Sequence, residues 1–176
     1  RELGDEHPTT LGSITNLAGP LRAQGKLDEA EPYIRDSLKV RQRLLGEEHK
    51  DTLTSVINLA ILQHSQGKHR ETIELLVPID AAARKALVGP DSWRLGRLLM
   101  TLGKTRRVLG EFSAAETNLI EAQPIFVQSR GGTDKDIQEC LQALVDLYTA
   151  WHAAEPDKGY GAKAAEWKTK LDALPQ

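Results

Sequence analysis

Few side chains in this sequence have the types and spacing that catalysis or metal binding requires. The five histidines are His7, His49, His64, His69 and His152, and the single cysteine is Cys140. A zinc site needs three or four convergent ligands, and one cysteine can form neither an internal disulfide nor a cysteine-based zinc site. No nucleophile lies in a pattern that supplies a general base. We therefore expect no catalytic activity, no metal and no cofactor.

Two further groups of side chains admit a functional and a structural interpretation. Asp28, Glu29 and Glu31 could act as an acid–base set, but they lie at the start of a predicted helix, where the helix dipole favours negative charge. The tryptophans could form an aromatic binding cage, or they could pack between structural units, because large aromatic side chains dominate buried surface. They are Trp93, Trp151 and Trp167. We favour the structural interpretation of both groups.

Composition excludes several classes of partner. The chain has 176 residues with 23 basic and 25 acidic side chains, a formal net charge of -2. Nucleic-acid binding needs clustered excess of Lys and Arg, so no nucleic-acid partner is expected. No apolar run approaches the roughly 20 residues that span a bilayer, so we expect no membrane contact and a cytoplasmic location. Because the chain begins at Arg1, we expect it to be part of a longer protein.

The sequence repeats itself at an interval of about 42 residues. Leu3–His7 recurs as Leu45–His49, and Asn16–Ala18 recurs as Asn58–Ala60. A third copy begins at Val88, and a fourth opens at Gly131. So many matches at nearly one offset indicate a repeat architecture.

Within each copy the apolar spacing is helical and glycines separate two helices. Leu95, Leu98, Leu99 and Leu102 follow the i, i+3, i+4, i+7 pattern. Glycine favours the left-handed conformation that ends helices, and two glycine series recur: Gly4, Gly46, Gly89 and Gly132, and Gly25, Gly67 and Gly110. Strand signals are absent. Each copy is therefore predicted to be a helix pair, with Asp51 as one N-cap.

Small residues and prolines predict local geometry. Ala18, Ala60 and Gly103 should lie where the two helices of a pair approach closely. Their partners on the second helix would be Ala30 and Ala115, although Thr72 breaks this second series. An interior proline removes a helix hydrogen bond and costs about 3 kcal/mol. We expect kinks near Pro20 and Pro78, while Pro124 also falls inside a predicted helix.

The segment Asn16–Ala18, followed by Leu21 and Gln24–Glu31, resembles the tetratricopeptide repeat. The longer period and the connector Leu3–Leu11 are similar to the kinesin light chain variety. The C-terminal tail, with Pro156–Gly161 and then Ala164–Trp167, resembles the tails of large bacterial serine/threonine kinases. The resemblance implies an all-α, right-handed superhelical solenoid of about four helix-turn-helix units.

We divide the predicted array, a single repeat domain over residues 1–176, at its connectors. Residues 1–8 would be the remnant of a preceding repeat. The four repeats would cover 9–44, 45–87, 88–130 and 131–176, and the last would be divergent. It would include a C-terminal cap built on Trp167, Leu171 and Leu174, followed by Pro175.

The resemblance also implies a ligand surface, because in this family the first helix of each pair lines a concave groove. Asn16 and Asn58 match the asparagines that clamp a peptide backbone, whereas Thr101 and Asp146 replace them in later repeats. His64 falls on the same surface. Arg22, Arg97, Lys104 and Arg107 oppose one acid, Asp146, which makes the groove locally basic.

We therefore predict a non-catalytic protein–protein interaction module that binds a peptide segment, acidic in character, in this groove. The alternative is a structural spacer or self-association scaffold in a multidomain bacterial signalling protein. In that case the open N-terminal face would pack on further repeats. Peptide binding by a monomer would favour the first hypothesis, and oligomerisation without peptide binding would favour the second.

Overall fold

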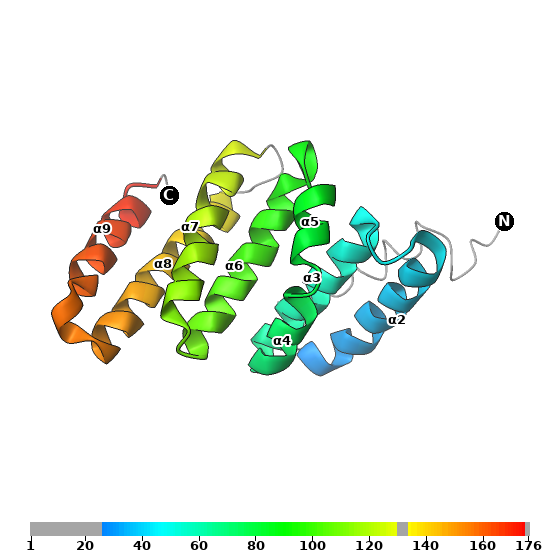
Figure 1. Ribbon diagram of the computed structural model, residues 1–176, viewed down its shortest axis with the longest axis horizontal. Coiled ribbons are helices and arrows are strands. Elements are labelled where there is room, and N and C mark those ends of the chain that lie inside the picture. Colours follow the sequence, from blue (N-terminus) through cyan, green and yellow to red (C-terminus); the bar gives the residue numbers. More distant parts are fainter. Residues whose placement is uncertain (1–25, 130–133, 175–176) are drawn as a thin grey trace. The chain divides into compact units, whose positions relative to one another are not determined.

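The described part of the chain is helical throughout. The computed structural model describes residues 26–129 and 134–174, and no strand occurs among them, which confirms the predicted all-α class. In chain order the α-helices are α2 (Leu27–Leu45), α3 (Lys50–Ser65), α4 (His69–Leu76), α5 (Asp80–Ala86), α6 (Ser92–Val108), α7 (Phe112–Gln128), α8 (Asp134–Ala154) and α9 (Tyr160–Asp172) (Figure 1). Short 3-10 helices, η1 (Gly89–Asp91) and η2 (Pro156–Lys158), precede α6 and α9.

Two compact units make up the chain, residues 1–86 and residues 87–176. In the first, α2 packs on α3, and α3 packs on both α4 and α5. Its core joins one face of α2 to one face of α3, and its buried members are Ala30, Ile34, Leu38, Val56, Leu59 and Leu62. Burying such side chains stabilises the fold by about 1.5–3 kcal/mol each.

In the second unit, neighbouring helices pack in sequence order. α6 packs on α7, α7 on α8 and α8 on α9, and α6 also contacts α8. The fully buried side chains of this unit include Leu98, Leu119, Phe126, Leu144 and Tyr148. The predicted division into four repeats stays a prediction, although α6 with α7, and α8 with α9, each fall within one predicted repeat.

Identical turns end the first helix of two pairs. Gly67 and Gly110 both have φ near +78°. After α3, the amide of Lys68 donates to the carbonyl of Gln63 at 2.9 Å, and the amide of Gly67 donates to that of His64 at 3.0 Å. The same two bonds follow α6, from Glu111 and Gly110 to the carbonyls of Arg106 and Arg107. This is the Schellman motif, which requires a left-handed residue and explains the recurrent glycine.

The predicted close approach of paired helices is confirmed for α6 and α7. Ala30, Ala60 and Ala115 have no exposed surface. A Cβ atom added at Gly103 would lie 2.5 Å from the Leu119 Cγ atom and 3.2 Å from the Ala115 carbonyl oxygen. Thr72, which replaces alanine in the series, is fully buried, and its hydroxyl donates to the Lys68 carbonyl at 2.8 Å.

The prolines have unequal effects. α4 ends at Leu76 and α5 begins at Asp80, so the helix is interrupted at Pro78, as predicted. α7 continues through Pro124 from Phe112 to Gln128. Pro20 lies outside the described residues. The predicted N-cap was wrong: α3 begins at Lys50, and its N-cap is His49, whose ring nitrogen accepts from the Asp51 amide at 3.2 Å.

Helix α9 covers α8 through partly buried side chains. Trp167, Leu171 and Leu174 are half-buried, whereas Pro175 lies outside the described residues, and the C-terminal cap stays a prediction. Near its start, Tyr160 stacks on Trp151 with ring centroids 4.0 Å apart. No helix in the described residues is long and apolar enough to span a membrane.

Candidate peptide-binding surface

Helix α3 carries the two predicted site residues of the first unit that are described. Asn58 and His64 are both partly exposed, and so is Ile61, which lies between them in the sequence. Their positions, 58, 61 and 64–65, recur every three to four residues, so they share one face of the helix. The neighbouring Ile57 is only 2% exposed and belongs to the core.

The polar groups around Asn58 are already bonded within the helix. The Thr54 hydroxyl donates to the Lys50 carbonyl at 2.6 Å, and the Ser65 hydroxyl donates to the Ile61 carbonyl at 3.0 Å. The His64 ring lies 5.1 Å from the His69 ring across the turn. The described residues contain no group of three metal-binding side chains, so we do not propose a metal site at these two rings.

Helix α6 carries the predicted basic residues of the second unit. Arg97, Lys104 and Arg107 are partly exposed and lie seven and ten residues apart, which places them along one side of the helix. Arg97 is already paired, because its Nε atom lies 3.1 Å from the Asp136 carboxylate, whose side chain is 6% exposed. This arginine therefore stabilises the contact between α6 and α8 and offers a ligand less charge than expected.

Lys104 and Arg107 remain as the charged part of this face. Within the described part of the chain, neither side chain has an ion-pair partner, and the Arg107 Nε atom is buried without a hydrogen bond. Burial raises the pKa of the neighbouring Cys140 thiol to about 12, against the opposing charge of Lys104. On α8, Asp146 accepts from the Gln142 amide at 2.7 Å.

Two contributors to this face, Arg94 and Asp136, were missed from the sequence. The guanidinium carbons of Arg94 and Arg97 lie 5.1 and 5.4 Å from the centre of the Trp93 ring, and Asp136 binds Arg97 from a helix 39 residues away. Arg94 and Asp91 show the i, i+3 spacing of a helical ion pair, which the sequence could have revealed. Asp136 gave no such signal. Trp151 is buried, which confirms the packing interpretation for it, whereas Trp93 and Trp167 are partly exposed and their packing between units stays a prediction.

The structure leaves the predicted surface divided into parts. Asn58 and His64 belong to the first unit, and Arg97, Lys104 and Arg107 belong to the second. Asn16 and Arg22 lie outside the described residues. The site prediction as a whole stays a prediction.

Comparison with known proteins supports the repeat interpretation. Residues 1–76 match the family model described as tetratricopeptide repeat. Among solved structures, the nearly identical TPR-like repeats of a Podosopora anserina protein named after kinesin light chain match with a TM-score of 0.66 and 21% identity. That match covers 98% of this chain and 81% of the other. The crystal structure of a variant of the same repeats has a TM-score of 0.70 and 21% identity, and covers 98% of this chain and 76% of the other.

BtubC (BKLC) from P. vanneervenii matches with a TM-score of 0.70 and 18% identity, over 100% of this chain and 69% of the other. A search of curated proteins gives no match. At these identities the structural matches show the fold alone. Residues 1–76 are thus similar to the tetratricopeptide repeat family, and the chain shares the fold of these kinesin light chain-like repeat structures, as the sequence predicts.

Proposed function

We propose that this chain is a non-catalytic protein-interaction module that binds extended peptide on the exposed faces of α3 and of α6. The tetratricopeptide repeat fold implies a protein partner. The observation that carries the finer proposal is the pair Lys104 and Arg107, two partly exposed cations on α6 without an ion-pair partner in the described residues. An acidic side chain of the peptide would complete that pairing.

The two faces would contribute differently to binding. Asn58 on α3 would hydrogen-bond the peptide backbone, because a carboxamide both donates and accepts. It would therefore add affinity for any sequence. Lys104 and Arg107 would select acidic side chains, since complementary charge contributes to specificity and to the rate of encounter. A rigid helical face also requires little ordering of the protein on binding. We place the module in the cytoplasm.

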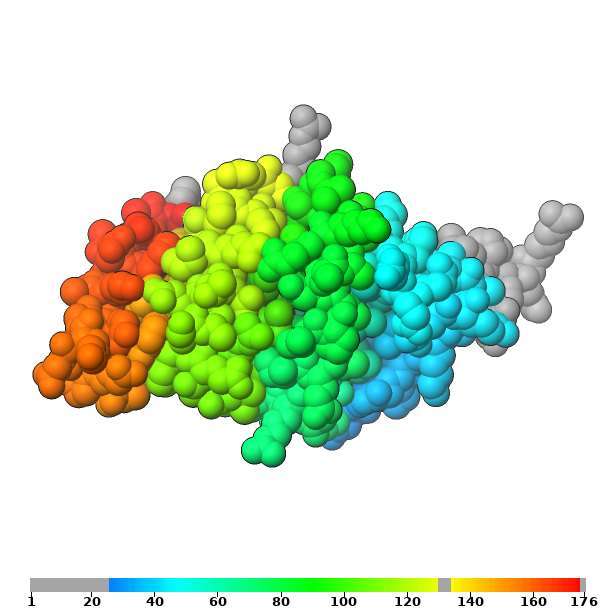
Figure 2. Space-filling model, in the orientation of Figure 1, coloured from blue at the N-terminus to red at the C-terminus, as the bar shows by residue number. Residues whose placement is uncertain are grey.

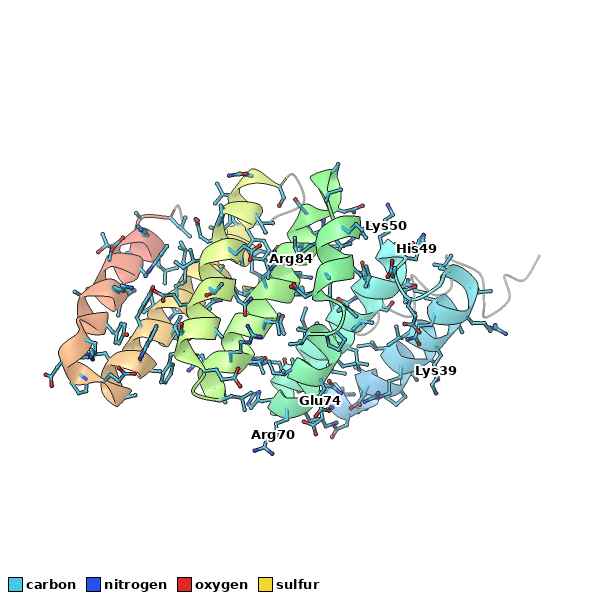
Figure 3. The ribbon with its side chains drawn as sticks, in the orientation of Figure 1. Lys39, His49, Lys50, Arg70, Glu74 and Arg84 are labelled. Carbon is cyan, nitrogen blue, oxygen red and sulfur yellow. The ribbon has the colours of Figure 1, made fainter. Side chains whose placement is uncertain are left out.

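The test uses an array of immobilised peptides of matched length with and without Asp and Glu. The double variant Lys104→Glu/Arg107→Glu should lose about tenfold or more in affinity for the acidic peptides alone. The control is Lys39→Glu/Arg70→Glu, which makes the same charge change at exposed positions of α2 and α4, where Arg70 extends into solvent (Figure 3). Circular dichroism must first show equal helix content.

Equal binding of acidic peptides by wild type and the α6 variant would contradict the charge-selective part of the proposal. The Asn58→Ala variant tests the other part separately. It should weaken the binding of acidic and neutral peptides by a similar factor, about three- to tenfold for one lost hydrogen bond. An array that shows no peptide binding by wild type would contradict the function as a whole.

A further inference from the structure

Helix α7 is the second helix of its pair, and its outer face differs from the outer faces of α2 and α4, which are also second helices. Helix α2 exposes charged side chains that include Asp36, Lys39 and Arg43, and α4 exposes Arg70, Glu71 and Glu74. Figure 3 shows Lys39, Arg70 and Glu74 on these helices. The residues that α7 exposes are all uncharged. Charged residues normally dominate the solvent face of an amphipathic helix, so this absence in α7 needs an explanation.

The exposed residues of α7, apart from its last, form a regularly spaced stripe. Its members are Ser113, Thr117, Ile120, Pro124 and Val127, which we name the outer stripe of α7. They succeed one another at steps of four, three, four and three residues, the spacing of a helix–helix seam. Ile120 is 42% and Val127 is 58% exposed. α7 lies on the face shown in Figure 2, coloured yellow-green.

The polar groups beside the outer stripe are bonded within the protein. The Thr117 hydroxyl donates to the Ser113 carbonyl at 3.1 Å. α7 has two charged residues, Glu116 and Glu121. The Glu116 carboxylate accepts from Lys163 Nζ at 2.9 Å and from the Tyr148 hydroxyl, and Glu121 also interacts with another group of the protein. The stripe therefore offers little charge to steer or select a charged partner.

We propose that the outer stripe of α7 is a self-association surface that binds α7 of a second copy of this chain. A two-fold axis brings identical patches together, so a self-complementary patch must avoid like charges. In an antiparallel pair centred between Ile120 and Pro124, each Ile120 would pack on Pro124 of the second copy. Each Thr117 would then pack on Val127. The residues of the stripe carry no charge, so they bring no like charges together across the axis. Their 4-3 spacing is that of two helices packed along a seam.

The dimer is expected to be weak. The stripe is short compared with the roughly 800 Å² per partner that stable complexes bury. It lies on α7, whereas the proposed peptide-binding residues lie on α3 and α6, so the two activities are separable. A variant that abolishes dimerisation should leave peptide binding unchanged.

Sedimentation equilibrium of the 176-residue protein, from about 5 µM to about 500 µM, tests the association. Wild type should show a monomer–dimer equilibrium. Ile120→Glu should weaken the dimer about tenfold or more, because it places two like charges near the axis. The control Val77→Glu changes a side chain of similar exposure, 46%, in the first unit and should leave the dimer intact. A monomer at every concentration, or equal effects of the two variants, would overturn the proposal.

A disulfide test checks the orientation of the pair. Thr117→Cys and Val127→Cys, mixed and oxidised, should give a heterodimer, whereas each alone should not, because like positions are about 15 Å apart along the antiparallel helices. The native Cys140 is fully buried and has a raised pKa, so it should stay unreactive. Cross-linking no greater than that of a Val77→Cys control would contradict α7 pairing.

Discussion

At the scale of single residues, Gly103 determines how closely α6 and α7 approach. An added Cβ would lie 2.5 and 2.8 Å from two carbons of Leu119, well inside van der Waals contact. Gly103→Ala should therefore destabilise the protein by about 1–3 kcal/mol through overpacking, despite the gain of about 1 kcal/mol in helix propensity. Urea unfolding followed by circular dichroism would measure this.

Gly161→Ala is the matched control, because Gly161 also lies in a helix but has a different neighbour. Its added Cβ would come no closer than 3.3 Å to the exposed His152 ring, which can shift. This substitution should be neutral or stabilising by up to about 1 kcal/mol. Equal destabilisation by both substitutions would show that close packing at Gly103 is not the cause.

Glu31 links α2 to the turn between α3 and α4. Its carboxylate accepts from Lys68 Nζ at 2.9 Å, from the Gln66 amide at 3.0 Å and from Arg35 Nε at 2.8 Å. The hydrogen bond from Lys68 is the largest influence, and together with those from Gln66 and Arg35 it lowers the pKa of Glu31 from 4.5 to about 2, against the effect of burial.

A lowered pKa makes the contribution of Glu31 dependent on pH. The ionised form is favoured in the folded protein, so the stabilisation is complete above the unfolded pKa and is lost as pH falls from 4.5 towards 2. Glu31→Gln should cost about 1–2 kcal/mol near pH 7, and the difference from wild type should shrink progressively below about pH 4.5. Urea unfolding at several pH values measures it.

Glu29→Gln provides the comparison on the same helix, because Glu29 is 62% exposed and lies 3.6 Å from Lys26. Exposed pairs contribute little, so this variant should change stability by less than about 0.5 kcal/mol at any of these pH values. A Glu31→Gln effect that does not vary with pH would contradict the proposed role of the carboxylate charge.

At the scale of elements, proline has different consequences at two positions, Pro124 and Pro78. α7 runs unbroken through Pro124, so the carbonyl of Ile120 lacks the amide that another residue would supply. At Pro78 the helix has already ended, with the Val77 amide bonded to the Ile73 carbonyl at 3.0 Å. Pro124→Ala should therefore stabilise the protein by about 1–3 kcal/mol, while Pro78→Ala should have less than about 1 kcal/mol of effect.

Thermal and urea unfolding of the two proline variants would decide between this expectation and its opposite. If Pro78→Ala were the more stabilising substitution and also raised helix content, the break between α4 and α5 would be imposed by the proline alone. If Pro78→Ala is not the more stabilising substitution, the surrounding packing favours the break independently of the proline. The sequence predicted a kink near Pro78 and placed Pro124 inside a helix, but it could not show that α7 would continue through Pro124.

The helices were predictable because their signals are local. Apolar spacing identified α3 and α6, and the left-handed glycines at 67 and 110 identified the turns that end them. The close approach at Gly103 followed from residue size. The N-cap of α3 was predicted two residues too late, because aspartate is a common cap, whereas the residue that caps α3 is a histidine, His49.

At the scale of the whole molecule, the candidate site was less predictable than the fold. The positions of Asn58, Lys104 and Arg107 on exposed helix faces follow from helical periodicity. The pairing of Arg97 with Asp136 does not, because it joins side chains on two helices 39 positions apart in sequence. Counting charges along one helix therefore overestimated the net positive charge that α6 offers.

The net charge of the whole chain makes a further prediction about the proposed peptide binding. With a formal charge of -2, the protein does not attract an acidic peptide at long range. Attraction must come from the local pair Lys104 and Arg107, and such exposed pairs are screened by salt over about 8–10 Å. Affinity of an acidic peptide should fall about three- to tenfold between roughly 50 mM and 500 mM salt.

Fluorescence anisotropy of a labelled acidic peptide measures this dependence, and two variants assign it. Lys104→Glu/Arg107→Glu should remove or reverse the salt dependence, because the attractive charges are replaced by repulsive ones. Asn58→Ala should lower affinity at every salt concentration and keep the slope of wild type, since its hydrogen bonds are uncharged. A wild-type affinity that does not change with salt would show that peptide recognition depends on the helix faces without these two cations.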